Sequence, residues 1–341
     1  MSTIKEVAKR AKTSITTVSR VINNTSYVKE ETRQKVLQAM KELNYRPLTR
    51  EPVVKENRSL ALVVPDVSNP FFGKIAKGIA TVANKFVYNI ILCNIDGIPA
   101  GDGDYLMDLI KNRVDGVIYA SSYRIGEVVR KARDNNIPIV IFDREVRDFA
   151  VDTVTINNNQ GAYLATEHLI LSGHKKIAFI GGSEKFQVSE QRKKGYMRAL
   201  KEHGIYFDEG LIFTGDFTME SGFKAMNLLL LNKKPFTACI AANDLMAIGA
   251  INCLNQHGIM VPEEISVIGF DDISLASAMT PKLTTVAYPI ERISERSLEL
   301  LMKQISDINS SPEIITLFPR LIIRESTTGS KGMERGAESE K

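Results

Sequence analysis

A repeated alternation between short apolar runs and helical patterns dominates the sequence after Ser59. Alternation of this kind predicts βαβ crossovers and parallel, doubly wound sheets of the α/β class. This part of the chain is too long for one ordinary hydrophobic core, so we expect two lobes that face each other across a cleft. The expected strands cover residues 60–64, 89–93, 116–120, 138–142, 176–180, 238–241 and 266–270.

The start of the chain has a different pattern, in which two short amphipathic helices flank a tight turn within residues 4–24. Apolar residues recur at helical spacing on both sides of that turn. Ser14 is a suitable cap for a helix that begins at Ile15. A third helix is predicted over residues 29–44, and its expected apolar face consists of Val36, Leu37, Met40 and Leu43. These three helices predict a small helix-turn-helix domain.

The second helix of such a domain enters the major groove of DNA. Ile15 could meet a thymine methyl group, Thr16 could contact a base edge, and Arg20 could reach guanine or a phosphate. The alternative is a surface helical hairpin in which Thr and Ser serve solubility. The residues expected to contact DNA are Thr3, Ser14, Ile15, Thr16, Thr17, Ser19, Arg20, Asn23, Val54 and Lys55.

Charge is distributed unevenly along the chain. Residues 1–58 contain 13 Lys and Arg against 6 Asp and Glu, a net charge of +7, whereas the whole chain carries only +4. Basic charge gathered at one end of a neutral-to-acidic chain is typical of a nucleic-acid-binding module attached to a larger body. This partition favours the DNA-binding interpretation over the surface hairpin.

Ordered motifs along nearly the whole chain carry a family resemblance. They include Val7-Ala8, residues 17–23, residues 44–47, residues 68–72, residues 113–116, Gly215-Asp216-Phe217, residues 269–272 and Leu283-Thr284-Thr285. In these motifs the chain resembles the lactose-repressor (LacI/GalR) family of bacterial transcription regulators. The resemblance implies a helix-turn-helix domain followed by a two-lobed core like that of periplasmic binding proteins.

The loops expected after the strands hold aromatic, acidic and amide side chains. Sugars suit this mixture, because their apolar ring faces pack on aromatic rings and their hydroxyl groups hydrogen-bond to Asp, Asn and Arg. The family resemblance implies that Phe71, Phe72, Asp143, Arg192, Phe217, Asn243 and Asp271 bind an effector in the cleft. Structural roles remain open as alternatives: Phe71 or Phe72 could cover the core of the first lobe, Asp244 or Asp272 could cap a helix, and Asp143 could close a turn.

Neither an enzyme nor a metal site is indicated. The sequence lacks a GxGxxG segment after a strand, a GxxxxGK[ST] segment and a GxSxG segment. The four histidines lack metal-ligand spacing, and the three cysteines suit reduced thiols of a cytosolic protein. We therefore expect no cofactor and no metal. Because no signal peptide or membrane span is evident, we expect a cytoplasmic protein without membrane contact.

These observations lead to one functional hypothesis and several alternatives. We expect a sequence-specific repressor, a homodimer on near-palindromic operator DNA, whose affinity a small-molecule effector modulates. A sugar is the expected effector. The alternatives are a catabolite regulator activated by a protein partner, a repressor that responds to a purine, and, least favoured, a sugar-processing enzyme.

The expected domain bounds follow the change in pattern. They are a DNA-binding domain at 1–46, a hinge linker at 47–58, a core at 59–328 and a disordered tail at 329–341. Within the core, the first lobe is expected at 59–157 and 288–316, and the second at 158–287 and 317–328.

The hinge linker departs from the family pattern. Glu51 and Pro52 replace the usual Ala-Arg pair, and Val54 stands where the family places a Leu that wedges into the minor groove. Because Pro resists a helix interior and Val is smaller than Leu, we expect weaker minor-groove readout than is usual for the family. Replacing Pro52 with Arg and Val54 with Leu should then tighten operator binding. A second departure lies in the turn of the DNA-binding domain, where Lys12-Thr13 stands at the place of a Gly-Val pair that is frequent in the family.

Overall fold

The computed structural model describes residues 3–23, 28–43, 45, 58–95, 114–120, 125–143, 149–184 and 186–328, without the side chains of residues 22 and 23. The chain divides into two compact units, residues 1–57 and residues 58–341. The predicted DNA contacts Val54 and Lys55, the hinge residues Glu51 and Pro52, and the expected tail lie outside the described residues, as does the side chain of Asn23.

The N-terminal unit contains three helices, α1 (Ile4–Arg10), α2 (Ile15–Asn23) and α3 (Glu30–Glu42). Thr3 and Glu6 form a reciprocal capping box at the start of α1, in which the Thr3 side chain accepts from the Glu6 amide and the Glu6 side chain accepts from the Thr3 amide. Ser14 Oγ accepts from the amide of Thr17 at 3.0 Å. The cap that the sequence predicts before Ile15 is therefore confirmed.

A small apolar core joins these helices. Val7, Val18 and Val36 are fully buried at its centre, and each comes from a different helix. Leu37, in contrast, is 44% exposed, so its predicted place on the buried face is wrong. The buried positions of α3 are Val36 and Ala39, with Met40 and Leu43 packed against them. They follow the helical steps of three and four residues, and Leu37 lies one residue, about 100°, off that stripe.

The turn between α1 and α2 contains a residue in an unusual conformation. Lys12 has φ of 51°, in the left-handed region that favours glycine.

An exposed ion pair between Arg10 and Glu42 at 2.5 Å links α1 to the end of α3 in this unit. Because both partners of this pair are well solvated, it contributes little to stability.

The second unit is built on two six-stranded sheets. The first has the order β11-β5-β4-β3-β1-β2, and all of its neighbouring strands are parallel. Its strands are β1 (Ser59–Val64), β2 (Asn89–Asn94), β3 (Gly116–Tyr119), β4 (Ile139–Phe142), β5 (Asp152–Ile156) and β11 (Ile314–Leu317). The second has the order β12-β10-β9-β8-β6-β7, and only the pair β10 and β12 is antiparallel among its pairs. Its strands are β6 (Ile177–Gly181), β7 (Ile212–Thr214), β8 (Ala238–Ala241), β9 (Ser266–Phe270), β10 (Thr284–Ala287) and β12 (Arg320–Ile322).

Every strand that the sequence predicts is present, and its bounds differ by at most one residue. The pattern of residues 176–214, which reads as a strand, a polar loop, a helix and a strand, also predicts β7 at its end. Four strands were not predicted, namely β5, β10, β11 and β12. Strand β5 reads DTVTI and its polar residues are as buried as its apolar ones. Strand β12 contains only three residues. Such strands lack the continuous apolar run that marks a buried parallel strand.

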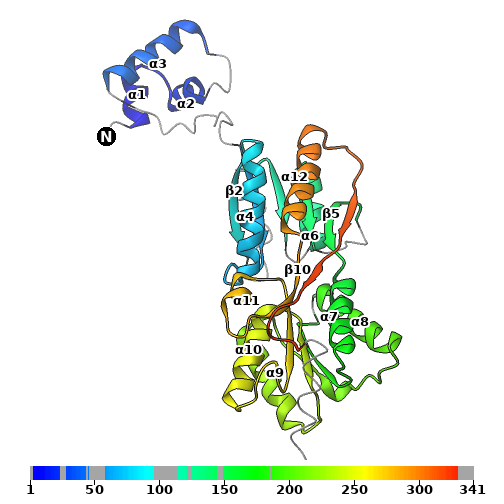
Figure 1. The fold of residues 1–341 in the computed structure, drawn as a ribbon. Coiled ribbons are helices and arrows are strands. Elements are labelled where there is room, and N and C mark those ends of the chain that lie inside the picture. Colours follow the sequence, from blue (N-terminus) through cyan, green and yellow to red (C-terminus); the bar gives the residue numbers. More distant parts are fainter. Residues whose placement is uncertain are drawn as a thin grey trace, which may run out of the picture. The chain divides into compact units, whose positions relative to one another are not determined.

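Helices cover both faces of each sheet (Figure 1). Helix α4 (Pro70–Lys85) packs on α12 (Ile290–Ser306), and α6 (Ile125–Asp134) also belongs to the first lobe. In the second lobe, α7 (Asn158–Leu171) pairs with α8 (Gln187–Glu202), and α9 (Met219–Leu231) pairs with α10 (Asp244–Gln256) across the sheet from them. The remaining helical elements are η1 (Glu209–Leu211) and α11 (Ser274–Ala278). The confirmed architecture is thus two doubly wound α/β lobes.

The chain passes between the two sheets more than once. It leaves the first sheet after β5, returns after β10, and crosses again between β11 and β12. The lobes are therefore held together by chain segments as well as by side chains. Tyr288 follows β10 directly and so lies on one of these crossings. No helix among the described residues is long and apolar enough to span a membrane.

Candidate functional site

A cavity of about 350 Å³ lies where the carboxyl ends of strands from both sheets meet. This is the edge at which open parallel sheets bind ligands. The first lobe contributes residues that follow β1, β3 and β4, and the second lobe contributes residues that follow β6, β7 and β9. Its wall includes Pro65, Asp66, Ser68, Asn69, Phe71, Phe72, Ala120, Phe142, Asp143, Phe186, Gln187, Val188, Arg192, Asp216, Phe217, Thr218, Met219, Glu220, Leu245, Asp271 and Tyr288.

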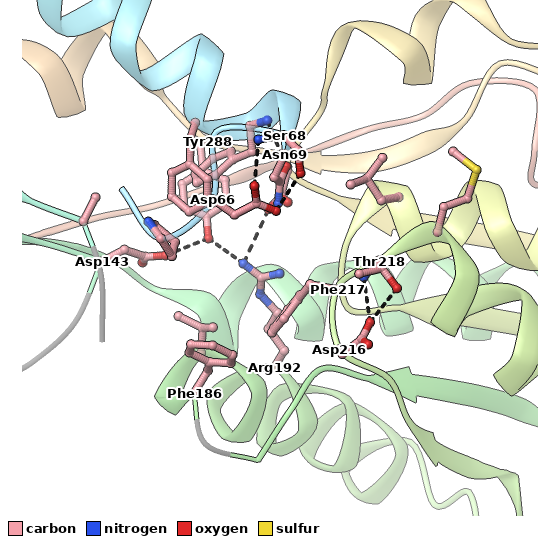
Figure 2. A pocket seen from close by; sticks show the side chains of 18 of the residues that line it. Asp66, Ser68, Asn69, Asp143, Phe186, Arg192, Asp216, Phe217, Thr218 and Tyr288 are labelled. Atoms are coloured by element: carbon pink, nitrogen blue, oxygen red, sulfur yellow. Dashed lines mark hydrogen bonds and ion pairs between the residues drawn. The ribbon is translucent and has the colours of Figure 1, made fainter. Parts of the chain in front are cut away.

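Arg192 lies at the centre of the polar contacts of this cavity (Figure 2). Its side chain extends from α8 and is only 4% exposed. Nε donates to Asn158 Oδ1 at 2.9 Å, Nη2 donates to the hydroxyl of Tyr288 at 2.6 Å, and Nη1 donates to the carbonyl oxygen of Ala242. Nη2 also forms an ion pair with Asp271 Oδ1 at 3.5 Å. The guanidinium is therefore fixed in one orientation by residues from several elements.

The guanidinium also packs on an aromatic ring. Its carbon lies 3.8 Å from the centroid of the Phe270 ring, directly before Asp271 in the chain. A cation over the face of an aromatic ring is stabilised by the ring quadrupole, and more so when water is excluded. The Phe270 ring therefore covers one face of the guanidinium.

Tyr288 connects the two lobes through its hydroxyl group. That oxygen lies 3.1 Å from Asp143 Oδ2 in the first lobe and 3.1 Å from Asn158 Oδ1 in the second. Asn158 Nδ2 in turn donates to Asp143 Oδ1 at 3.0 Å. Because each group both orients and satisfies the next, the network forms a buried polar bridge between the lobes.

The carboxyl groups of Asp143 and Asp271 are protonated more readily than exposed ones. Burial raises the pKa of Asp143 to about 6, although Arg192 opposes this shift. Burial likewise raises the pKa of Asp271 to about 7 against the attraction of Arg192. Desolvation therefore outweighs ion pairing at both carboxyl groups. Groups of this kind change their charge near neutral pH.

Three residues with strained backbone line this cavity. Asp143, Phe217 and Asp271 have φ of 58°, 72° and 107°, and each follows the end of a strand. Non-glycine residues adopt such values at a cost of about 1–3 kcal/mol each. At these positions the conformation aims the side chains into the cavity.

Aromatic rings supply much of the remaining wall. Phe71 contacts the rings of Phe72 and Tyr288, with centroids 5.2 Å and 5.0 Å away. On the other side of the cavity, Phe186 and Phe217 form an edge-to-face pair at 5.6 Å. Aromatic faces from both lobes thus line one space, as a ligand with apolar ring faces would require.

The structure brings together all but one of the residues predicted to bind an effector. Phe71, Phe72, Asp143, Arg192, Phe217 and Asp271 all line the cavity. Asn243 is absent from its lining residues. It caps α10 instead, where Oδ1 accepts from the amide of Met246 at 2.9 Å, and Nδ2 donates to the carbonyl oxygen of Phe217 at 2.9 Å. Asn243 therefore shapes the loop that carries Phe217.

The structural alternatives have mixed outcomes. Phe71 is 6% exposed and belongs to the core as well as to the cavity wall. Asp244 does not cap α10, because Asn243 does, and its carboxylate accepts from the Thr285 hydroxyl at 2.5 Å. Asp272 does not cap α11 either; it pairs with Arg324 at 2.6 Å.

Sequence reasoning missed several residues of the site. Tyr288, Asn158 and Phe186 were not predicted, and neither was Asp216. Tyr288 follows a strand without an apolar run, and Asn158 opens a helix, where an Asn is usually explained as a cap. The post-strand position of Asp216, in Gly215-Asp216-Phe217, was the one signal that could have found it.

Most of the predicted DNA contacts of the N-terminal unit lie on the surface. Ile15 is 44% exposed although it is apolar, and Thr16 and Arg20 are also exposed. Thr17 and Ser19 are half-buried. Ser14 and Thr17 are joined by a hydrogen bond between their hydroxyl groups at 2.8 Å. The start of α2 therefore presents an exposed apolar and hydroxyl-bearing surface, which is the chemistry that base edges and thymine methyl groups require.

The described residues contain no cluster of three or more His, Cys, Asp and Glu side chains able to hold a metal ion. The cysteines Cys93, Cys239 and Cys253 are free thiols. Burial raises the pKa of all three, to about 12 for Cys239. A thiol with a raised pKa is a poor nucleophile at neutral pH.

Comparison with known proteins gives a consistent result for both units. Residues 3–47 match the family model of bacterial regulatory proteins of the lacI family. Residues 166–327 match the model of the periplasmic binding protein-like domain. The HTH-type transcriptional repressor PurR of Photobacterium profundum is 37% identical over 329 residues, which cover 96% of this chain and 98% of that protein.

Solved structures of two regulators have a similar fold to this chain. The complex of the transcriptional regulator CelR with cellobiose has a TM-score of 0.73 and 32% identity, and covers 96% of this chain and 100% of that one. A LacI family regulator from Enterococcus faecium with bound ribose has a TM-score of 0.72 and 30% identity, and covers 80% of this chain and 99% of that one.

Proposed function

This chain belongs to the lacI family of bacterial regulatory proteins, and on that premise we propose that a saccharide bound between the lobes of its core controls its affinity for operator DNA. The chain is a DNA-binding transcriptional repressor modulated by an effector. The proposal concerns the class of the effector and the residues that bind it. The observation that carries it is the cavity between the lobes, where aromatic rings surround Arg192 and the carboxyl groups of Asp143 and Asp271.

Each part of that wall suits one part of a sugar. The rings of Phe72 and Phe217 could pack on the apolar faces of the sugar ring. Arg192 could donate to hydroxyl oxygens, and Asp271 could accept from hydroxyl groups. Similar proteins have been solved with cellobiose and with ribose, which supports a saccharide in this cavity.

The position of the cavity supports a mechanism of control. Because its wall comes from both lobes, a ligand that contacts both would favour one separation of the lobes over others. Such a change would reach the DNA-binding domain through the hinge, so the operator and the effector would each alter the affinity for the other. We expect the bound saccharide to be recovered chemically unchanged.

Several assignments accompany this proposal. We propose that Thr3, Ser14, Ile15, Thr16, Thr17, Ser19, Arg20, Asn23, Val54 and Lys55 contact DNA. A homodimer is proposed because near-palindromic operators match two-fold protein symmetry. A cytoplasmic location follows from the DNA target. A regulatory protein partner is the alternative to be tested if no small molecule binds.

The test combines a thermal-shift screen with a DNA-binding assay. A ligand that binds only the folded state raises the unfolding midpoint, so pentoses, hexoses, disaccharides and purine bases are compared on the full chain. We expect a free sugar to raise the midpoint and to change operator affinity. Asp271→Asn should remove the shift, whereas Asp307→Asn, at an exposed position after α12, should preserve it. A shift with purine bases alone would contradict the saccharide assignment.

A further inference from the structure

Most of the charged residues described in the cavity wall are acidic. Five acidic residues line it, namely Asp66, Asp143, Asp216, Glu220 and Asp271. Among the described residues that line it, Arg192 is the one basic residue, and there is neither lysine nor histidine. The described part of the wall therefore presents mostly acidic groups to a ligand.

The charge of Arg192 is already engaged by the protein. Three of its N–H groups donate to Asn158, Ala242 and Tyr288, and Asp271 lies 3.5 Å from Nη2. The cation also lies against the Phe270 ring. An additional anion would have to share this single cation with carboxyl groups that are already near it.

Lys74, a first-lobe lysine that acts electrostatically on Asp271, is also engaged. Lys74 of α4 forms an ion pair with Asp272 at 3.6 Å and donates to its main-chain oxygen. Arg324 pairs with the same carboxylate at 2.6 Å. Neither cation lines the cavity. They neutralise Asp272 next to the site and add no positive charge to its wall.

Two acidic residues at the more exposed part of the wall strengthen the imbalance. Asp216 Oδ1 accepts from the amide and the hydroxyl of Thr218, at 3.0 Å and 2.6 Å. Burial acts against ionisation of Asp216, but the hydrogen bonds from Thr218 and Ser221 outweigh it and lower its pKa. Glu220 lies in the first turn of α9 and is exposed. Both therefore place negative charge beside the cavity.

We propose that the cavity selects uncharged saccharides and rejects the sugar acids and sugar phosphates of the same ring size. This inference rests on the proposed function, because it assumes that the ligand is a saccharide. An anionic ligand would lose its hydration on entering the cavity and would gain too little attraction there to compensate. A neutral ring keeps the aromatic contacts and offers hydroxyl donors to the carboxyl groups.

The experiment compares matched sets of ligands on the full chain by isothermal titration calorimetry at pH 7.5 and low salt. The sets of equal ring size are glucose with glucuronate and glucose 6-phosphate, galactose with galacturonate and galactose 6-phosphate, and cellobiose with cellobiouronate. Ribose is added as a further neutral sugar. We expect at least one neutral sugar to bind, and its anionic counterparts to bind at least tenfold more weakly. Because exposed charges are screened by salt, this ratio should decrease at 0.5 M salt.

A double variant links the effect to the cavity charges. Asp216→Asn with Glu220→Gln removes two acidic groups at exposed positions of the wall, so the ratio between the affinities for neutral and anionic ligands should decrease several-fold, whatever the change in affinity for the neutral sugar. Glu209→Gln with Glu263→Gln removes two exposed acidic groups of the same lobe that do not line the cavity, and should leave the ratio unchanged.

The outcomes separate this inference from the proposed function. A sugar acid or phosphate that binds as tightly as its neutral counterpart, or more tightly, would overturn the selectivity and leave the saccharide assignment intact. No binding by any of these saccharides, with operator binding preserved, would overturn the saccharide assignment and the selectivity with it.

Discussion

The DNA-binding unit and the cavity of the core both depend on polar side chains near helix starts, but they place them differently. In the N-terminal unit, Ser14 contacts Thr17 and Thr3 contacts Glu6, so each partner lies three residues away. In the core, the hydrogen-bond partners of Arg192 lie 34, 50 and 96 residues away and are buried. The contacts in the N-terminal unit join residues close together in the chain, whereas the cavity exists only when the two lobes are folded and joined.

This difference has an energetic consequence. An exposed hydroxyl or ion pair loses little when a partner is removed, because water replaces it. A buried charged group without its partner retains its full desolvation cost. We therefore expect substitutions in the cavity network to be costly, and substitutions on the surface of the N-terminal unit to be mild.

The largest effect is expected from Arg192→Met. It leaves the carboxyl groups of Asp143 and Asp271 buried without their cation, so the free energy of unfolding of the core should fall by about 3–5 kcal/mol. Urea denaturation of the full chain measures this change. Arg296→Met removes an exposed arginine that forms an ion pair with Glu299, three residues away, and should cost less than about 1 kcal/mol. Equal losses in the two variants would contradict the comparison.

A pH dependence should accompany the buried carboxyl groups. The pKa of Asp271 in the folded chain is about 7, above that of an unfolded Asp, so the folded state holds this proton longer. Its stabilising contribution is complete below about pH 4 and is lost as the pH rises to about 7.

The variant Asp271→Asn tests this sign directly. The stability of the natural chain relative to the variant should fall by about 2–4 kcal/mol between pH 4 and pH 7, and should level off above that range. Denaturant unfolding at several pH values measures the difference. A relative stability that rises with pH would show that the carboxyl group is held ionised in the folded state.

An intermediate effect is expected in the core of the N-terminal unit. Val18 is fully buried, and Val18→Ala removes two methyl groups and leaves a small cavity. The free energy of unfolding of this unit should fall by about 2 kcal/mol, which is a large share of the stability that so small a core provides. DNA binding should weaken at raised temperature, while effector binding by the core stays unchanged. Loss of both activities together would indicate that the two units unfold as one.

The smallest effect is expected at the turn. Lys12→Gly removes the strain of a left-handed lysine, about 1–2 kcal/mol, but adds freedom to the unfolded chain worth about 0.5–1 kcal/mol. Thermal unfolding should therefore show that the free energy of unfolding of the N-terminal unit rises by about 0.5–1 kcal/mol. Lys41→Gly, in the last turn of α3, should destabilise by about 1 kcal/mol. A loss from Lys12→Gly would show that the lysine side chain has a stabilising contact.

The sequence predicted local features well. The cap at Ser14 and the apolar runs of the central strands need only near neighbours, and the structure has both. The error at Leu37 is also local, since an exposed leucine on a helix is apolar but lies off the buried stripe. Most of the effector residues implied by the family resemblance line the cavity, but the resemblance could not tell that Asn243 holds the Phe217 loop and does not line the wall.

By itself, the sequence determined the helix-turn-helix segment, the alternation of strands and helices, and the class of the fold, because periodicity and capping act between residues close together in the chain. Only the tertiary structure decided which polar groups meet. Tyr288, Asn158 and Asp143 touch because the chain crosses between two sheets, and their pKa values and orientations depend on burial that no single segment possesses. Long-range contact and desolvation arise together on folding, and neither can be deduced from the spacing of residues close together in the chain.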